Sequence, residues 1–298
     1  MKTIVSVILL GVVVAIPARA QDFEAVEIRT TDLGGGIYML SGAGGNLGLT
    51  VGVDGGFLID DDYAPLAEKI RAAISAVTDR GVRYLINTHW HGDHVGGNEQ
   101  FAQRGALIIA HDNVRARLRA GVNDASTATV PPVPPAALPI VTFSEAVTVH
   151  LNGHELHARH APAAHTDGDA IIYFKDVNVV HMGDVFFNRR YPFIDAGSGG
   201  SLGGYIAAQE AVLGRIDDST KIIPGHGPLA SKADLERAVR MLKTVRDRVA
   251  ALMVGGGSED DVVERIDLSD FDPDWEWQFI TGEVMTRQVY RELKKGSG

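Results

Sequence analysis

The 298-residue sequence contains no cysteine, which excludes disulfide bonds and a lipid-anchored cysteine. It also lacks a hydrophobic run long enough for a typical membrane-spanning helix, because its one extended apolar stretch covers only residues 4–16. No stripe of basic residues is present, and 38 Asp and Glu outnumber 28 Lys and Arg, for a formal net charge of −10. An acidic chain of this kind repels phosphate backbones, so we expect no nucleic-acid partner.

The first twenty residues have the pattern of a secretory signal peptide. Lys2 precedes the apolar stretch, and Ala18-Arg19-Ala20 provides a small-residue cleavage site. We expect cleavage near Ala20, a periplasmic or secreted bacterial location, and no stable membrane association of the mature chain; an uncleaved N-terminal anchor is the alternative. Residues 21–298 should form a single domain, with a core at about 35–230 and a helical C-terminal extension at about 231–295. The sequence leaves the oligomeric state open.

Short apolar runs bounded by glycine or polar residues indicate two groups of β-strands. The expected strands lie at 37–40, 47–53, 57–59 and 82–87 in the first group, and at 139–143, 146–151, 153–159, 169–175, 177–182 and 220–223 in the second. The glycine-rich residues 42–46 should form a flexible tip between two strands. They are not a phosphate loop, because the required Lys-Ser/Thr ending is missing.

Apolar residues recur at helical spacing in several other stretches, so the chain is predicted to be mixed α/β. We expect helices at 62–77, after Asn98, after Asp112 and at 205–217. A long amphipathic helix should begin after the N-cap Ser231 and end at residue 254, before the glycines 255–257. Residues 259–295 should be mostly helical, with Trp275 and Trp277 packing rather than binding a ligand.

Four potential metal ligands lie within six residues, directly after the expected strand at 82–87. They are His89, His91, Asp93 and His94. Residues two apart on an extended backbone point to the same side, so His89 and His91 can converge on one ion. Gly92 permits a tight turn, after which Asp93 and His94 can address a second ion. Imidazole and carboxylate ligands in this mixture suit zinc first, and iron or manganese next.

Three further candidate ligands follow expected strands, beside glycine or small residues that let the backbone approach an ion. They are His165, Asp184 and His226. The sequence thereby resembles the metallo-β-lactamase-fold hydrolases, whose pattern of His-x-His-x-Asp-His, a distant His, an Asp and a final His is matched in order. The resemblance implies an α/β fold of the four-layer αββα sandwich type, here with extra C-terminal helices.

The resemblance also implies a site for two zinc ions. His89, His91 and His165 would hold the first ion, Asp93, His94 and His226 the second, and Asp184 would bridge them. Two neighbouring cations lower the pKa of a shared solvent oxygen to near neutrality, so that a hydroxide would attack a carbonyl polarised by one zinc. Asp93 would be the catalytic residue that orients this hydroxide. Asp60, at the end of an apolar run, is a candidate for orienting a ligand histidine.

The other histidines are expected outside the metal site. His150, His154, His157 and His160 flank an Asn152-Gly153 turn that predicts a β-hairpin, and we interpret all four as exposed strand residues. The spacing of His154 and His157 is not that of the helical zinc motif. His111 and His181 are expected to pack in the core or to support a ligand.

These features favour hydrolysis of a small-molecule amide, ester or thioester, and β-lactam ring opening is one candidate reaction. The resemblance is closest to hydrolases other than the secreted lactamases, because those often carry cysteine at the position of Asp184 and the commonest class carries arginine at that of His94. Phe187 stands where that class has a lysine for the substrate carboxylate. Arg189 and Arg190 lie close by and are candidates for binding an anionic substrate group; a solvated pair is the alternative.

Three other functions remain as alternatives. A glyoxalase II-like thioesterase or lactonase would use a similar ligand set. A mononuclear-iron sulfur oxidoreductase would use a similar ligand string for oxygen chemistry, with one iron in place of two zinc ions. A metal-binding protein would hold the ions without turnover. The substrate would be selected by the loops at 42–46, 124–139 and 188–204.

Overall fold

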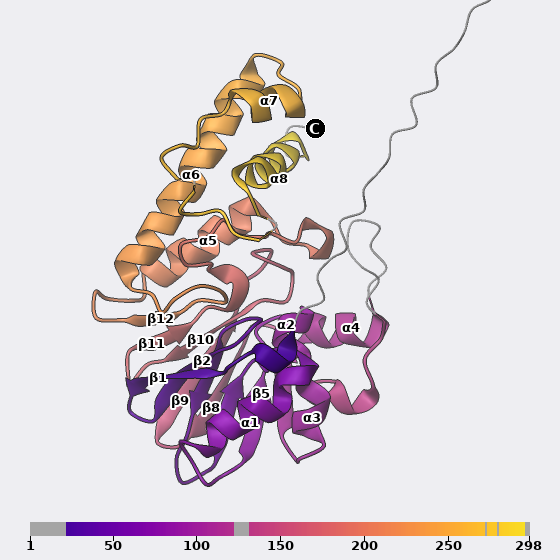
Figure 1. Cartoon of the computed structure of the whole chain (residues 1–298), viewed down its shortest axis with the longest axis vertical. Coiled ribbons are helices and arrows are strands. Elements are labelled where there is room, and N and C mark those ends of the chain that lie inside the picture. The colour runs from indigo at the N-terminus through magenta and orange to yellow at the C-terminus, as the bar shows by residue number, and fades with distance from the viewer. Residues whose placement is uncertain (1–21, 122–130, 272, 279, 296–298) are drawn as a thin grey trace, which may run out of the picture.

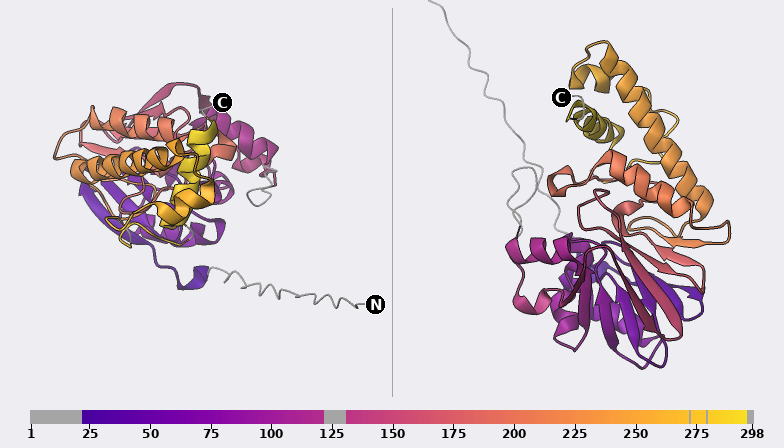
Figure 2. Two further views of the ribbon diagram at one scale, coloured as in Figure 1. Left: turned by 90° about the horizontal axis from the view of Figure 1, so that it is seen from above. Right: turned by 180° about the vertical axis from the view of Figure 1, so that it is seen from behind.

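The computed structural model describes residues 22–121, 131–271, 273–278 and 280–295 (Figure 1). The expected signal peptide at residues 1–20 lies outside this part of the chain, as does part of the expected loop at 124–139. The described chain forms two β-sheets with helices on both outer sides (Figure 2). None of the described helices is both long and apolar enough to cross a membrane.

The first sheet contains seven strands in chain order. They are β1 (Arg29–Gly34), β2 (Ile37–Ser41), β3 (Leu47–Thr50), β4 (Gly56–Ile59), β5 (Val82–Ile86), β6 (Leu107–His111) and β7 (Val141–Phe143). The pairs from β1 to β4 are antiparallel, and those from β4 to β7 are parallel. Parallel pairing places the carboxyl ends of β4 and β5 at one edge of the sheet. The segments that follow these two strands therefore lie side by side.

Strands β1 and β6 extend the sheet beyond the strands expected from the sequence. The strand expected at 139–143 was assigned to the second group, which is wrong, because β7 pairs with β6 in the first sheet. All residues of β1 except Leu33 are exposed, so this edge strand has no alternation of apolar and polar residues. The apolar run of β6 is buried except at Leu107. A short, continuously apolar run does not distinguish a buried strand from a helix.

The second sheet contains five strands in the order β12-β11-β10-β9-β8. They are β8 (Ala146–Leu151), β9 (His154–His160), β10 (Ala170–Phe174), β11 (Val179–His181) and β12 (Lys221–Ile223). The predicted Asn152-Gly153 turn joins β8 to β9, and both residues have positive φ, 56° and 81°, as a type I′ turn requires. β11 and β12 are parallel neighbours, so their carboxyl ends also meet.

The two sheets pack face to face, which confirms the expected αββα sandwich. Their inner faces form one core that includes Phe57 and Ile86 of the first sheet and Ile172 and Phe174 of the second. The outer face of the first sheet packs against α1 (Ala67–Ser75) and α3 (Asn98–Ala102), and the outer face of the second against α5 (Leu202–Leu213) and α6 (Lys232–Val254). α4 (Asp112–Ala120) follows β6, at the edge of the first sheet where the carboxyl ends of β4 and β5 also lie (Figure 1).

The C-terminal region is less helical than expected. Ser231 caps α6 as predicted, and the side chain of Asp234 completes a capping box. Beyond α6, only α7 (Glu259–Arg265) and α8 (Gly282–Lys295) are helices, so the expectation of a mostly helical stretch is wrong for the described residues between 266 and 281. Pro273 is incompatible with a helix interior, and Trp277 forms an isolated bridge with Ile280. This segment runs from the helices back to the sandwich (Figure 1).

Candidate metal centre

The ends of parallel strands bring together candidate ligands that are far apart in sequence. His89 and His91 follow β5, and Asp93 and His94 lie on α2 (Gly92–Val95), a single helical turn that begins just after His91. His165 comes from the loop between β9 and β10. The other two ligands follow the parallel strands β11 and β12: Asp184 lies in a 3₁₀ turn, and His226 lies three residues beyond β12. All seven predicted ligands meet at one place, in two groups that could each hold a metal ion.

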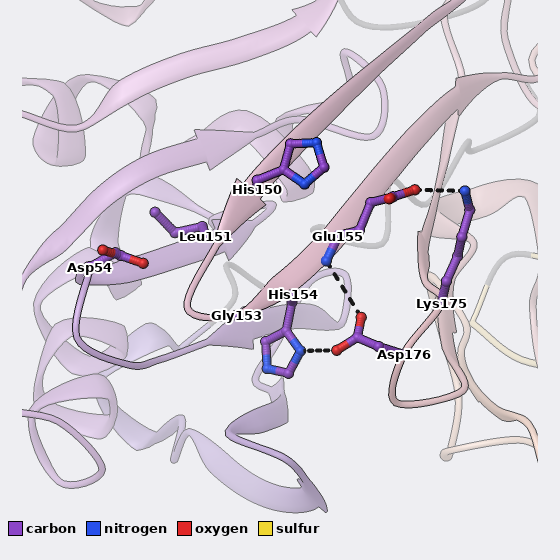
Figure 3. A pocket seen from close by; sticks show the side chains of 8 residues that line it. All are labelled: Asp54, His150, Leu151, Gly153, His154, Glu155, Lys175 and Asp176. Atoms are coloured by element: carbon purple, nitrogen blue, oxygen red, sulfur yellow. Dashed lines mark hydrogen bonds and ion pairs between the residues drawn. The ribbon is translucent and has the colours of Figure 1, made fainter.

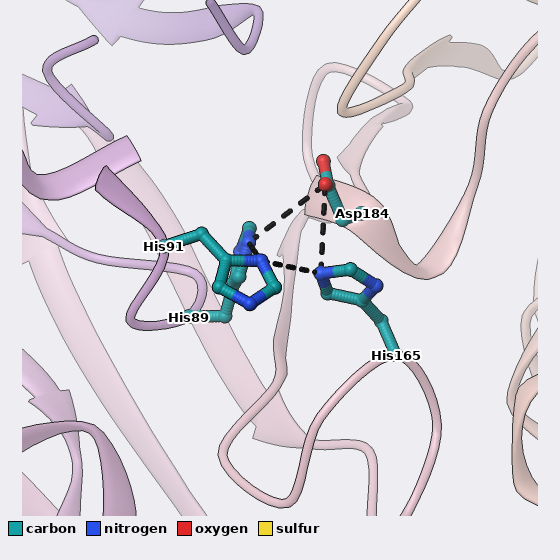
Figure 4. Close-up of side chains that lie close together, drawn as sticks. All are labelled: His89, His91, His165 and Asp184. Atoms are coloured by element: carbon teal, nitrogen blue, oxygen red, sulfur yellow. Dashed lines mark hydrogen bonds and ion pairs between the residues drawn. The ribbon is translucent and has the colours of Figure 1, made fainter. Parts of the chain in front are cut away.

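The first group consists of His89, His91, His165 and one oxygen of Asp184 (Figure 4). The Nδ1 atom of His91 lies 3.2 Å from Nε2 of His89 and 2.9 Å from Nε2 of His165. Oδ2 of Asp184 lies 3.8 Å from Nε2 of His89 and 3.6 Å from Nε2 of His165. Metal–nitrogen bonds of about 2.0–2.1 Å in a tetrahedral site would separate neighbouring ligand atoms by about 3.3–3.4 Å. The observed spacing fits one ion.

Hydrogen bonds on the outer side of each ring decide where these three histidines carry their protons. Nδ1–H of His89 donates to the Thr88 hydroxyl (3.0 Å), Nδ1–H of His165 to the Phe193 carbonyl (2.8 Å), and Nε2–H of His91 to Asp195 (3.0 Å). The inner nitrogen of each neutral ring therefore presents a lone pair. Burial lowers the pKa of His165 to about 4 and that of His89 well below its usual value, so both rings stay neutral. Three converging lone pairs are suited to a cation.

The second group consists of Asp93, His94, His226 and the other oxygen of Asp184. Oδ1 of Asp184 lies 3.1 Å from Nε2 of His94 and 3.4 Å from Nε2 of His226. Oδ2 of Asp93 lies 3.3 Å from Nε2 of His226 and 3.7 Å from Nε2 of His94. Nε2 of His94 and Oδ1 of Asp184 are buried and make no hydrogen bond of good geometry. Such buried polar atoms call for a partner, and an ion between them would provide one.

The electrostatics of the second group favour ionised carboxylates. Burial opposes the ionisation of Asp184, but the surrounding histidines outweigh it and hold the pKa of this carboxyl well below its usual value. Burial likewise opposes the ionisation of Asp93, but His94 and His226 lower its pKa to about 2. Both carboxylates therefore carry a negative charge at neutral pH and are ready to bind a cation.

Asp60, the candidate for orienting a ligand, lies directly behind His94. Its Oδ2 atom accepts a hydrogen bond from Nδ1–H of His94 (2.7 Å) and one from the Thr88 hydroxyl (2.7 Å). Its Oδ1 atom accepts the backbone N–H of Thr88 (2.7 Å). Asp60 is fully buried, and its φ of 59° directs the chain into this arrangement. The contact holds one proton of His94 on Nδ1. Burial opposes protonation of the ring, but Asp184, Asp93 and Asp60 outweigh it and raise the pKa of His94 well above its usual value, so a metal at Nε2 would displace the second proton.

Asp195 makes the equivalent contact with His91 and was not identified from the sequence. It lies in the loop between β11 and α5, 104 positions beyond His91, and no spacing rule connects the two. Its Oδ1 atom accepts the backbone N–H of Ser198 (3.0 Å), which leaves Oδ2 for His91. Burial opposes the ionisation of Asp195, but the hydrogen bond from His91 outweighs it and lowers the pKa to about 2.

Asp195→Asn is expected to weaken metal binding to the first group, and with it turnover, about tenfold. The oxygen of the amide must still accept from Ser198, so its NH₂ group would face Nε2–H of His91 and lose that hydrogen bond. Calorimetric titration of the metal-free protein with zinc would measure the affinity, with Asp261→Asn on α7 as the control of equal charge. Equal affinities in the two variants would contradict this role for Asp195.

The glycine-rich loop at 42–46 is held against the site rather than forming a flexible tip. The backbone N–H of Gly45 donates to the Asp93 carbonyl (3.1 Å), and the Asn46 side chain donates to the carbonyls of Pro224 and Gly227, both at 2.9 Å. A Cβ atom on Gly45 would lie 2.1 Å from the ring of His94. Position 45 therefore requires glycine, because the backbone passes close to the His94 ring. The prediction of a flexible tip is wrong.

The two candidate anion-binding arginines have different surroundings. Arg189 is exposed, and its charge contributes to lowering the pKa of Asp234 at the start of α6. Arg190 is half-buried and lies 4.7 Å from the centre of the Trp277 ring. Phe187, at the position of the absent lysine, stacks on His226 with ring centres 5.0 Å apart. Trp275 packs in the core as predicted, whereas Trp277 packs beside His226, with ring centres 5.5 Å apart.

The remaining histidines lie outside both groups, as predicted, but most are not exposed. Of the hairpin histidines only His150 is exposed, because the other three have neighbours on adjacent segments. His154 contacts Asp176 and the Gly35 carbonyl, His157 contacts the Thr148 hydroxyl, and His160 stacks on His111. His181 supports the site, since its Nε2–H donates to the Asn46 carbonyl (3.1 Å).

A surface pocket of about 590 Å³ lies beside this hairpin (Figure 3). It is lined by Asp54, His150, Leu151, Gly153, His154, Glu155, Lys175 and Asp176. Apart from Asp54, which lies between β3 and β4, these residues come from the turn between β8 and β9 and from the end of β10, whereas His165 lies beyond the opposite ends of β9 and β10. None of these residues belongs to either candidate metal group of the described chain.

Comparisons with known proteins agree with this geometry. A family model described as the metallo-beta-lactamase superfamily matches residues 53–252. A hydroxyacylglutathione hydrolase from Polaromonas sp. is 27% identical over 192 residues, which cover 61% of this chain and 66% of that relative, slightly less than two thirds of its length.

Solved structures show the same fold at low sequence identity. A metallo-beta-lactamase from Pontibacter korlensis is 17% identical with a TM-score of 0.60, over 73% of this chain and 99% of that chain. The sec-alkylsulfatase Pisa1 from Pseudomonas sp. is 16% identical with a TM-score of 0.67, over 89% of this chain and 50% of that chain. The family match covers more than half of the sequence, and the fold and the histidine–aspartate cluster are consistent with it. The chain therefore belongs to the metallo-beta-lactamase superfamily.

Proposed function

We propose that this protein is a dinuclear zinc hydrolase that cleaves the bond between the acyl carbon and the nitrogen, oxygen or sulfur of a small amide, ester or thioester. The observation that carries the proposal is the placement of Asp184, which directs one oxygen into each of the two ligand groups. A pair of zinc ions held there would polarise a carbonyl and supply a water that ionises near neutral pH. Single structural sites need no such shared carboxylate.

Other residues of the site would admit the substrate, orient the attacking water and fix the tautomers of the ligand histidines. His91 and Asp93 are the more exposed members, with 17% and 21% of their side chains accessible, so the substrate would approach from their side. The low pKa of Asp93 keeps it ionised, and its carboxylate can accept a hydrogen bond from the attacking water and direct a lone pair of that water to the carbonyl carbon. Asp60 and Asp195 would keep His94 and His91 in the tautomers that the site requires.

The comparisons support two substrate classes within this proposal. Two solved relatives of the fold are named metallo-beta-lactamases, which supports a β-lactam. The Polaromonas relative is named a hydroxyacylglutathione hydrolase, which supports a thioester. Phe187 in place of the lactamase lysine disfavours a dedicated lactamase, so we expect modest hydrolysis of penicillins beside faster hydrolysis of an ester, lactone or thioester.

The decisive experiment combines metal analysis with a substrate panel. We expect about two zinc ions per chain and hydrolysis of at least one penicillin, lactone or glutathione thioester, lost after chelation and restored by zinc. Asp93→Ala should lose turnover with the metals retained in part. One iron per chain with oxygen uptake would favour the sulfur oxidoreductase instead. Full metal loading without turnover of any panel member would favour a metal-binding protein.

A further inference from the structure

The C-terminal segment between α7 and α8 contributes a side chain to the rim of the site. Besides packing beside His226, the Trp277 ring lies 5.7 Å from the ring of Phe187, measured between centres. Its Nε1–H donates to the Tyr191 carbonyl (2.8 Å), which sets the orientation of the indole. Trp277 is only partly buried, so one part of the ring remains accessible. The accessible part of Trp277, which packs on the buried Phe187, forms an aromatic surface next to the second ligand group.

Arg190 lies on this aromatic surface without an oxygen partner. Every other partly buried arginine of the described chain donates a hydrogen bond to a carboxylate or carbonyl oxygen: Arg71, Arg115, Arg117, Arg246, Arg248 and Arg287. Arg190 makes no hydrogen bond or ion pair among the described residues. Its guanidinium instead makes a cation–π contact with the Trp277 ring. Burial lowers its pKa, and no neighbouring carboxylate offsets the effect.

An unpaired guanidinium is unusual in a chain with ten more acidic than basic residues. The group has five N–H donors, stays charged at any ordinary pH, and cannot be left half-buried without a cost in hydration. A cation over an indole recovers part of that cost. The guanidinium edge remains available for the oxygens of an anion, which it can bind in a two-pronged geometry.

We propose that Trp277 and Arg190 bind the remote end of the substrate, recognising a carboxylate carried on a flat, apolar body. The apolar body would lie along the indole of Trp277, and the carboxylate would pair with Arg190. The inference rests on the proposed hydrolase function for its catalytic readout. It assigns the anion-binding role to Arg190 alone, because Arg189 is exposed and is not in contact with Trp277.

The catalytic test compares two esters in three proteins. The anionic ester is mono-para-nitrophenyl terephthalate, and the neutral one is para-nitrophenyl 4-methylbenzoate. Arg190→Gln should raise KM for the anionic ester and lower its kcat/KM at least about tenfold, the effect of one charge-assisted hydrogen bond, with the neutral ester changed less than about twofold. Arg189→Gln is the matched control, since it removes the same charge one residue away. Its preference between the esters should equal that of the wild type.

A binding test separates this inference from the proposed function. Benzoate is titrated into each protein while tryptophan fluorescence is followed, with benzyl alcohol as the neutral probe. Wild type and Arg189→Gln should respond to benzoate at similar concentrations, Arg190→Gln should need at least about ten times more, and Trp277→Phe should lose the response. Circular dichroism and metal content should match in all four proteins.

The outcomes are distinct. If benzoate binds as described but neither the two esters nor any penicillin, lactone or glutathione thioester of the panel is hydrolysed, the proposed function fails and the anion site stands. If the esters are hydrolysed but Arg190→Gln and Arg189→Gln show the same ester preference and benzoate response, the anion site is wrong and the hydrolase stands. Absence of both benzoate binding and hydrolysis would overturn both.

Discussion

Asp184→Asn is expected to lower kcat/KM for carbonyl hydrolysis by more than about a hundredfold and to remove one of the two metal ions. Residues that only orient metal ligands contribute about 10–100-fold, and Asp184 is placed as a ligand to both ions. Its two oxygens face different histidines: Oδ1 lies 3.1 Å from His94 Nε2, and Oδ2 lies 3.6 Å from His165 Nε2. An asparagine keeps the shape of the side chain but presents an oxygen to one group and an NH₂ donor to the other.

Metal content decides this prediction independently of the substrate. Inductively coupled plasma mass spectrometry should find about one zinc per chain in Asp184→Asn and about two in the wild type. Asp176→Asn, in the turn beside the surface pocket of Figure 3, removes the same charge far from the ligands and should retain both ions. Two bound ions in Asp184→Asn, with turnover within tenfold of the wild type, would show that the carboxylate does not bridge them.

The parts of the site that follow from local geometry could be predicted from the sequence. His89 and His91 follow a strand, Asp93 and His94 begin a helical turn, and their spacing alone brings them to one place. Asp184 and His226 follow strands as well. The family resemblance implied that they meet, and the structure shows why: β11 and β12 are parallel neighbours. The two sheets and the N-cap Ser231 were likewise accessible from apolar periodicity and capping patterns.

Contacts made by irregular segments could not be predicted in this way. Asp195 and Trp277 reach the site through loops, whose paths depend on the packing of the whole domain rather than on local spacing. The loop at 42–46 looks flexible from its glycines, but Gly45 is required because the backbone passes close to His94. The half-buried hairpin histidines were misjudged for a related reason. Strand polarity indicates which face a residue occupies, but it does not identify the neighbours that cover it.

Asp60→Asn is expected to weaken metal binding at the second group about a hundredfold while leaving the fold nearly intact. The carboxylate accepts from Thr88 N–H through Oδ1 and from His94 Nδ1–H through Oδ2, each at 2.7 Å. In the variant the amide oxygen must stay on Thr88 N–H, which directs the NH₂ group at His94. The imidazole would then accept at Nδ1 and carry its proton on Nε2, the atom that faces Asp184. A protonated Nε2 cannot bind a metal. The same exchange of carboxylate for amide beside a catalytic histidine lowers turnover about 10⁴-fold in serine proteases.

The neighbouring residue Asp61 provides a matched control for this argument. It is as deeply buried as Asp60, and its Oδ1 atom accepts the backbone N–H of Gly97 (2.8 Å). Burial raises its pKa well above the usual value and so favours the uncharged form of the side chain, which asparagine resembles. Asp61→Asn should therefore keep two zinc ions and full activity. Asp60→Asn should lose most of its second ion at limiting zinc and about a hundredfold in kcat/KM, with urea unfolding of the metal-free proteins showing similar midpoints. If Asp60→Asn instead retains both ions, the tautomer of His94 does not control the second group. If only its unfolding midpoint falls, Asp60 supports the fold rather than the metal.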